Sequence, residues 1–251
     1  MQPGMTRGGT LPASPVGGAA AQGSKRALVL GGTGAVGGAV LRELARRGVH
    51  AAFAYNRSED KARMLAAEYG HAAFRVDLAD PAATRTALDA LDTPDLVIHC
   101  AAVSGTLELA AIDVADWQHA MAVNVQSAYQ TCQWIAARGA RCDVVLVGGL
   151  DRAQSLPLPI HYAASQGALS ALVMALGHEL GPRDIRVNLV ALGVLNAGLS
   201  ERLAARRRKD YETFSALRRA GTPDEAAKLI VWLALDNTFI QGKVISANGG
   251  I

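Results

Sequence analysis

A glycine-rich stretch between a strand-like and a helix-like segment constrains the fold of this chain most. The apolar run Arg26 to Leu30 leads directly into G-G-T-G-A-V-G-G at 31–38, and a helical pattern follows at once. Such a turn directs backbone N–H groups and a helix N-terminus at one point, which suits a diphosphate. Glycine is needed wherever a Cβ would block the close approach of this ligand. The stretch therefore predicts a nucleotide-binding strand–turn–helix unit, the alternative being a flexible turn without a ligand.

The rest of the chain repeats the alternation of strand and helix. Strand-like runs recur at 49–54, 72–76, 94–100, 144–147 and 185–191, and helical patterns separate them. This alternation is typical of an α/β domain whose parallel sheet has helices on both faces. With 251 residues, half of them hydrophobic, the chain can bury the core of one such domain. We expect a single doubly wound parallel sheet over residues 25–251.

Composition sets the first 24 residues apart from this domain. Residues 1–24 are rich in Gly, Ala and Pro and contain one charge, Arg7. Such a segment cannot bury enough apolar area to order itself, so we expect a disordered tail. It also lacks the basic start and continuous apolar core of a signal peptide.

Charge and cysteine spacing argue against several classes of function. The formal charge of +3 is too small to indicate a nucleic-acid partner, and no apolar run has the length of a membrane span. Cys100, Cys132 and Cys142 show no metal-binding spacing and are typical of reduced core residues in a cytoplasmic protein. We therefore expect no nucleic acid, no membrane and no metal.

The end of the second predicted strand bears on the choice of cofactor. A dinucleotide ribose with free hydroxyls is normally held there by an Asp or Glu. Here the chain reads Y-N-R-S at 55–58, with no carboxylate before Glu59. Arg57 beside Ser58 suits a 2′-phosphate by charge and fork geometry. The pattern favours NADP(H) over NAD(H), the alternative being an ordinary solvated arginine.

The segment from Val144 to Leu169 carries a candidate acid–base residue, Tyr162. A phenol at the start of a helix, beside a strand end in an α/β chain, is well placed to give or take a proton. This segment resembles the active site of the short-chain dehydrogenase/reductase superfamily, in which a Ser precedes the Tyr and a Lys follows it by four residues. Here the Ser position is Gly149 and the Lys position is Gln166.

The resemblance extends over residues 25–251 and implies a Rossmann fold. It is nearest to the branch that reduces 3-oxoacyl thioesters and polyketides, and it implies a homo-oligomer, either a dimer or a tetramer. The family's glycine fingerprint, Thr-Gly-x-x-x-Gly-x-Gly, falls on Leu30, Gly31, Ala35 and Gly37, so the middle glycine is an alanine.

The resemblance also implies individual roles. Asn124, in a helix predicted over Asp116–Arg138, matches a family Asn that kinks this helix and positions a water. His99 stands where the family usually has Asn, and we expect it to be a hydrogen-bonded structural residue. Asn196 takes the place of a Thr that meets the nicotinamide carboxamide.

Two sets of site residues follow. The predicted catalytic set is Tyr162, Asn124 and Gln166. The predicted cofactor-binding set is Gly31, Thr33, Gly34, Ala35, Val36, Gly37, Asn56, Arg57, Ser58, Asp77, Leu78, Ala101, Ala102, Tyr162, Gln166, Gly193 and Leu195.

The two replacements change the chemistry that we expect. Gln166 has no charge with which to lower the phenol pKa, although its amide can still bind a ribose. A neutral Tyr162 is a usable acid but a poor base, so loss of the Lys harms alcohol oxidation more than ketone reduction. Gly149 removes one donor, a loss of about 10²-fold in rate by analogy with oxyanion holes. Ser155, His161 or a substrate hydroxyl are the candidates to replace that donor.

Two functions therefore stand. The first is an NADPH-dependent ketoreductase that reduces a carbonyl of an acyl thioester or polyketide-type substrate, with Tyr162 as proton donor. The alternative is a catalytically silent relative that serves as an NADP(H)-binding or partner-binding subunit. A non-redox reaction on the same scaffold is a third possibility.

A basic insertion at 197–219 is the expected place for a helical lid over the substrate. Two interpretations of its charges are open: a solvated helix face, or a landing surface for an acidic carrier protein that delivers the substrate. The charged residues of this basic lid are Arg202, Arg206, Arg207, Arg208, Lys209, Arg218 and Arg219.

Overall fold

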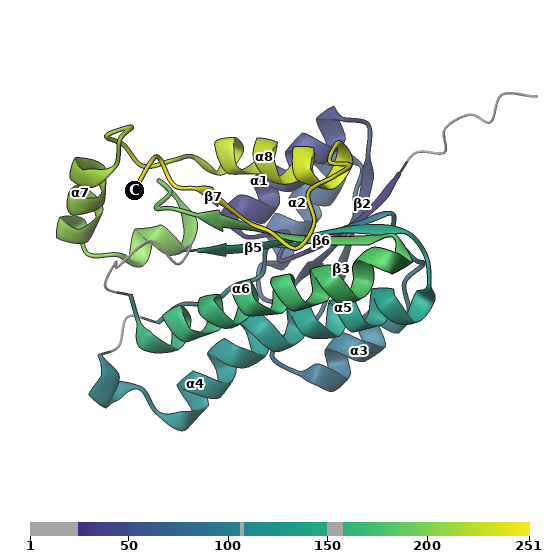
Figure 1. The fold of residues 1–251 in the computed structure, drawn as a ribbon, viewed down its shortest axis with the longest axis horizontal. Coiled ribbons are helices and arrows are strands. Elements are labelled where there is room, and N and C mark those ends of the chain that lie inside the picture. The colour runs from purple at the N-terminus through teal and green to yellow at the C-terminus, as the bar shows by residue number, and fades with distance from the viewer. Residues whose placement is uncertain (1–24, 106–107, 150–157) are drawn as a thin grey trace, which may run out of the picture.

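The protein is built around a seven-stranded sheet in which every strand pairing is parallel (Figure 1). The computed structural model describes residues 25–105, 108–149 and 158–251. The strand order is β3-β2-β1-β4-β5-β6-β7. The strands are β1 Arg26–Leu30, β2 His50–Tyr55, β3 Ala72–Arg75, β4 Leu96–His99, β5 Cys142–Gly149, β6 Ile185–Leu192 and β7 Val244–Ala247. The predicted doubly wound fold is confirmed.

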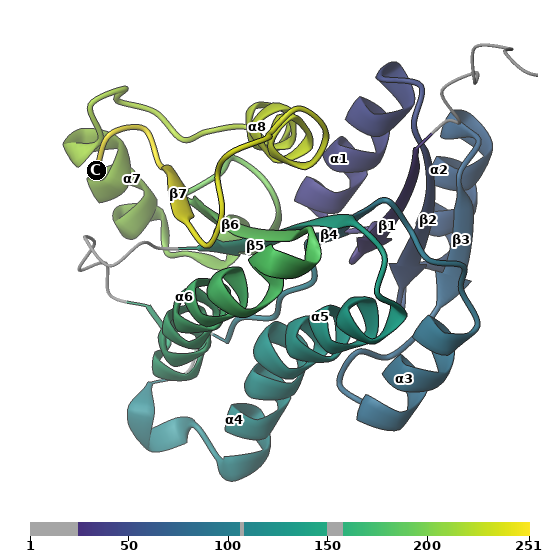
Figure 2. The ribbon, with the colours of Figure 1, turned by 45° about the vertical axis from the view of Figure 1, so that its right-hand side comes forward.

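Helices cover both faces of this sheet (Figure 2). Helices α1, α2 and α8 pack on one face, and α3, α5 and α6 pack on the other. The α-helices are α1 Ala35–Arg46, α2 Glu59–Tyr69, α3 Pro81–Asp89, α4 Val114–Met121, α5 Ser127–Arg138, α6 Ile160–Leu180, α7 Ala205–Phe214 and α8 Pro223–Leu235. Among the described residues, none of the helices is both long enough and apolar enough to cross a membrane.

The alternating faces of the strands supply both halves of the core. In β5, Val144 and Leu146 belong to the cluster that contains α5 and α6, whereas Val145 and Val147 belong to the cluster that contains α1 and α8. Successive side chains of a strand point to opposite faces, so a strand buried on both faces is a continuous apolar run. This explains the unbroken apolar run Val144–Val147 in the sequence.

Local capping signals set the start of two helices. Asp80 accepts hydrogen bonds from the N–H groups of Ala82 and Ala83 at the start of α3. Thr222 and Glu225 form a capping box at the start of α8, with Pro223 at the first helical position.

The helix predicted over Asp116–Arg138 is not regular. Its middle, Ala122–Gln126, is a π-helical turn between α4 and α5, and Asn124 lies within it. A π turn widens the helix locally and is frequent at functional sites. The prediction of one helical segment distorted at Asn124 is therefore confirmed, with the π turn as the distortion.

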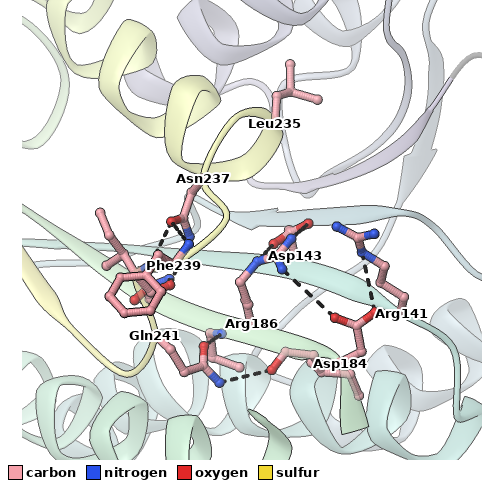
Figure 3. A network of polar contacts seen from close by, with 12 residues as sticks. Arg141, Asp143, Asp184, Arg186, Leu235, Asn237, Phe239 and Gln241 are labelled. Atoms are coloured by element: carbon pink, nitrogen blue, oxygen red, sulfur yellow. Dashed lines mark hydrogen bonds and ion pairs between the residues drawn. The ribbon is translucent and has the colours of Figure 1, made fainter. Parts of the chain in front are cut away.

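The amino ends of β5 and β6 carry a buried ion pair (Figure 3). Asp143 and Arg186 are register partners in these strands, and the guanidinium donates to both carboxylate oxygens at 2.6 and 2.8 Å. Only 8% of the Asp143 side chain and 15% of the Arg186 side chain are exposed. Asp184 lies at the rim of this pair, 3.9 Å from Arg186, with 62% of its side chain exposed. The pair joins the two strands at the edge of the sheet opposite the carboxyl ends.

Candidate active site

The strand order reverses beside β1, which pairs with β2 on one side and β4 on the other. At such a reversal the loops after neighbouring strands diverge and leave a crevice at the carboxyl ends. Two adjoining cavities occupy this place. The first cavity, of about 440 Å³, lies beyond β1, β2 and β4, and the second, of about 510 Å³, lies between the start of α1 and the ends of β5 and β6.

Fifteen of the predicted cofactor-binding residues line these cavities. Those of the first cavity are Gly31, Thr33, Gly34, Asn56, Arg57, Asp77, Leu78, Ala101 and Ala102. Those of the second are Gly34, Ala35, Val36, Gly37, Ala102, Tyr162, Gly193 and Leu195. Ser58 and Gln166 line neither, and their contact with a cofactor stays a prediction. Asn196, also predicted to touch the cofactor, is absent from both linings as well.

The backbone of the glycine-rich turn is packed so closely that Gly31 and Gly37 leave no room for a side chain. Gly31 has φ of +81°, and a Cβ there would lie 2.7 Å from the backbone nitrogen of Ala101. A Cβ on Gly37 would overlap the carbonyl oxygen of Gly31. Gly34 is the N-cap of α1 and offers no side chain to the free N–H groups of the first turn. These groups face the cavities and fit a diphosphate.

Arg57 lies at the rim of the first cavity. It is exposed, and among the described residues it has no ion-pair partner. A neighbouring link holds the loop, because Nε of Arg75 donates to the carbonyl oxygen of Asn56 at 3.1 Å. The arginine is thus available to a phosphate on an adenosine ribose, as the sequence predicts.

Tyr162 lies in the first turn of α6 and lines the second cavity beside Gly149 and Gly193. Burial raises the pKa of the phenol to about 12. Burial is the one cause of this shift. The phenol is therefore neutral at neutral pH, and it can donate a proton but accepts one poorly.

The amide of Gln166 is hydrogen-bonded within the protein and does not face the cavities. Its Oε1 accepts a hydrogen bond from the backbone N–H of Gly149 at 2.8 Å, and its Nε2 donates to Oγ of Ser165 at 3.3 Å. The side chain is 3% exposed. The amide thus secures the end of β5 to α6, and a contact with a ribose requires it to release one of these partners.

Asn124 ties the loop after β4 to α6. Its Nδ2 donates to the carbonyl oxygen of Val103 at 2.9 Å and to Oγ of Ser165 at 2.8 Å. Its Oδ1 accepts from the N–H of Val103 at 2.8 Å. The side chain is fully buried and lines neither cavity, so its geometry suits a positioning role.

His99 is a structural residue, as predicted. Its Nε2 is 2.7 Å from Oγ of Ser127, and burial lowers the pKa of the ring to about 4. Cys132 and Cys142 are buried core thiols. Cys100 differs, because it lines both cavities, and burial raises the pKa of its thiol to about 12. A thiol with this pKa is not a nucleophile at neutral pH.

The candidates to replace the missing serine have different outcomes. Ser155 lies outside the described residues. His161 is 4% exposed, packs against Gly105 and lines neither cavity. A role for either as a donor to the carbonyl stays a prediction. The described residues contain no cluster of side chains able to hold a metal ion.

Arg202 lines the cavities, although the sequence indicated a place in the basic lid and not in the cofactor-binding set. It belongs to the short helical segment Gly198–Arg202, and it lines both cavities where they meet. In the sequence it is the first of a run of basic residues, which suggested a surface role. Nothing in that run distinguishes Arg202 from the other arginines of the lid, so the sequence contains no signal of this position.

A doubly wound sheet with a nucleotide cleft at its reversal point and a phenol at the inner end defines a nucleotide-dependent oxidoreductase. A family model described as enoyl-(acyl carrier protein) reductase matches residues 32–251. The chain belongs to the short-chain dehydrogenase/reductase family.

Individual proteins agree with this assignment. The uncharacterized oxidoreductase YjdA of Bacillus subtilis is 31% identical over 244 residues, which cover 90% of this chain and 96% of the relative. A short-chain dehydrogenase/reductase from Serratia marcescens is 27% identical with a TM-score of 0.82, covering 90% of this chain and 97% of the other. A blue fluorescent protein from a metagenomic library, solved in complex with NADPH, is 26% identical with a TM-score of 0.82 and the same coverage.

Proposed function

We propose that this protein is an NADPH-dependent carbonyl reductase in which Tyr162 donates the proton. The observation that carries the proposal is the place of Tyr162 in the second cavity, which adjoins the glycine-rich turn and the start of α1. A phosphate held at the turn leaves the far end of a dinucleotide in the same cavity as the phenol.

Several residues support NADPH as the cofactor. The glycine-rich turn and the start of α1 would hold the diphosphate, and Arg57 would hold the 2′-phosphate. The solved NADPH complex of the metagenomic relative supports the same choice. When bound, NADPH supplies a hydride to the carbonyl carbon.

The chain's own part is the proton. As the carbonyl carbon gains the hydride, the carbonyl oxygen becomes an alkoxide, and the O–H bond of Tyr162 breaks to protonate it. The products are an alcohol and NADP⁺, and the phenolate left on Tyr162 regains its proton from water. A neutral phenol with a raised pKa is in the correct state for this direction.

The smaller cavity next to Tyr162 supports an acyl substrate. It has a volume of about 70 Å³. Leu158, Leu192, Leu199 and Leu203 line it together with Tyr162. A mostly apolar pocket of this size at a polar reaction centre suits a short stretch of hydrocarbon beside the carbonyl. The family model's description, which names an acyl carrier protein, agrees with an acyl thioester or polyketide-type substrate.

The test is NADPH consumption against 3-oxoacyl thioesters and polycyclic aromatic ketones, with NADPH affinity measured in parallel. Tyr162→Phe should lower turnover by about 10²-fold or more and leave the Kd for NADPH nearly unchanged. Full activity of the Phe variant would contradict the role of Tyr162. Tight binding of NADPH without turnover of any substrate would favour the silent binding subunit instead.

A further inference from the structure

We infer that Arg202 closes over the cofactor from the lid side and pairs with the diphosphate, a role that rests on the proposed function. The segment Gly198–Arg202 would then be part of the dinucleotide site, opposite the glycine-rich turn. This role separates Arg202 from the other basic residues of the lid.

Arg202 lies where the two cavities meet. It is exposed, and it lines the first and the second cavity together with Gly34, Cys100 and Ala102. Gly34 is the N-cap of α1, so the point where the cavities meet is the point at which the helix N-terminus is directed. A diphosphate that joins the two halves of a dinucleotide has to cross this junction.

The segment Gly198–Arg202 packs closely against the start of α1, next to the glycine-rich turn. Gly198 has φ of +76°, and a Cβ there would lie 2.9 Å from Cβ of Ala35. Ala35 is the first residue of α1. Glycine at position 198 therefore allows the lid segment to pack closely against the start of α1. Arg202 is the last residue of the same short helix.

The guanidinium of Arg202 has a neutral hydrogen-bond partner and keeps its full charge. Its Nη1 donates to the carbonyl oxygen of Ser104 at 3.1 Å, a neutral partner on the loop after β4. Glu201 and Asp77 also line the cavities, but among the described residues neither is ion-paired with Arg202. The link to Ser104 thus spans the cleft and orients the guanidinium without neutralising its charge.

Few positive charges line the cleft. The family's lysine, which holds the ribose of the cofactor, is Gln166 here, and its neutral amide is bound to Gly149 and Ser165. Among the described residues that line the two cavities, Arg57 and Arg202 are the arginines, and no lysine is present. Arg57 lies at the rim of the first cavity, so Arg202 is the permanent cation placed for the diphosphate.

The experiment measures binding, independently of turnover, of NADPH, NADH and adenosine 2′-monophosphate to three variants. NADPH and NADH share the diphosphate, whereas adenosine 2′-monophosphate has only the phosphate expected at Arg57. Arg202→Gln should weaken NADPH and NADH by the same factor, about 10- to 100-fold for a lost charge-assisted contact. It should leave adenosine 2′-monophosphate unchanged. Arg202→Lys should recover part of the loss, and the loss should shrink at high salt.

Arg63→Gln is the charge-matched control. Arg63 is 70% exposed on α2, and its ion-pair partners among the described residues are Glu59 and Asp60 of its own helix. All three affinities should therefore stay as in the wild type. Unchanged affinity of Arg202→Gln for both dinucleotides would overturn the inference, as would a loss confined to NADPH. A loss that includes adenosine 2′-monophosphate would indicate a structural clasp with Ser104 instead. A wild-type protein that binds neither dinucleotide would overturn the cofactor assignment itself.

Discussion

The hydroxyl oxygen of Tyr162 lies 2.6 Å from the position that a Cβ on residue 149 would occupy. The absent side chain at Gly149 and the position of the phenol are therefore coupled: the hydroxyl fills space that a serine at this position needs. The neighbouring Gly148 shows the same relationship with Gln166, whose Oε1 lies 2.7 Å from the corresponding Cβ position. Because residues 148 and 149 are glycines, the end of β5 has no side chains, and Tyr162 and Gln166 pack into the space that this leaves.

This contact predicts that Gly149→Ala will lower reductase turnover. The added Cβ has to push the phenol away from its position, and a displacement of about 1 Å at a reacting group can cost about 10²-fold in rate. The control is Gly167→Ala on the same helix as Tyr162, because a Cβ at Gly167 meets nothing within 4 Å. We expect steady-state kinetics to separate the two variants, and equal turnover for both would show that the phenol is not confined by Gly149.

The raised pKa of Tyr162 predicts different pH profiles for the two directions. Burial holds this pKa at about 12, so the donating form persists at neutral and moderately alkaline pH, and reduction should show no alkaline loss from Tyr162 in that range. Oxidation needs the phenolate, and its rate should rise about tenfold per pH unit. Gln166→Lys brings a cation to the site, lowers the phenol pKa and should move this rise to lower pH. A flat oxidation profile would contradict the role of Tyr162 as base.

Arg57 should decide between the two dinucleotides. Arg57→Glu replaces a cation with a carboxylate, which repels a 2′-phosphate and accepts hydrogen bonds from free ribose hydroxyls. We expect the Kd for NADPH to rise at least about tenfold, with that for NADH unchanged or lower. Arg63→Gln serves as the control, since Arg63 is 70% exposed on α2 and lines neither cavity. An equal loss of both dinucleotides would remove Arg57 from the cofactor site.

The basic lid offers a test of delivery on a carrier protein. Arg219 is paired with Glu225 at 2.6 Å, and Arg218 donates to the carbonyl oxygen of Thr213. Because both side chains have partners within the chain, the variants are made in α7. Reversal of Arg206 and Arg208 to Glu should lower kcat/KM on a carrier-bound substrate and spare a small soluble ketone. The difference should fade in 1 M salt. Equal behaviour on both substrates would leave α7 a solvated helix.

The ion pair at the far edge of the sheet should matter for stability alone. Asp143→Asn leaves the buried guanidinium of Arg186 without its carboxylate, which should lower the free energy of unfolding by about 3 kcal/mol. Asp184→Asn is the matched control, because its contacts with Arg141 at 3.6 Å and Arg186 at 3.9 Å are long and its side chain is exposed. We expect it to lower the free energy of unfolding by less than about 1 kcal/mol. Urea unfolding measures both. A large change in the NADPH affinity of the Asp143→Asn variant under native conditions would contradict this separation.

Local sequence determined the elements and the parts of the site within one element or turn. The strand–turn–helix at 26–46, the capping box at Thr222 and Tyr162 at the start of α6 follow from apolar periodicity, glycine and capping residues. The cavity residues at strand ends could also be predicted, because in a parallel sheet the carboxyl ends of neighbouring strands lie at the same edge.

Tertiary structure decided which side chains face the cleft. The amide of Gln166 could bind a ribose, but in this fold it accepts a hydrogen bond from the backbone N–H of Gly149 at the end of β5. Arg202 belongs to a basic run, yet the contact of Gly198 with Ala35 brings it to the junction of the cavities. These orientations depend on contacts between segments far apart in the chain, and local periodicity carries no information about such contacts.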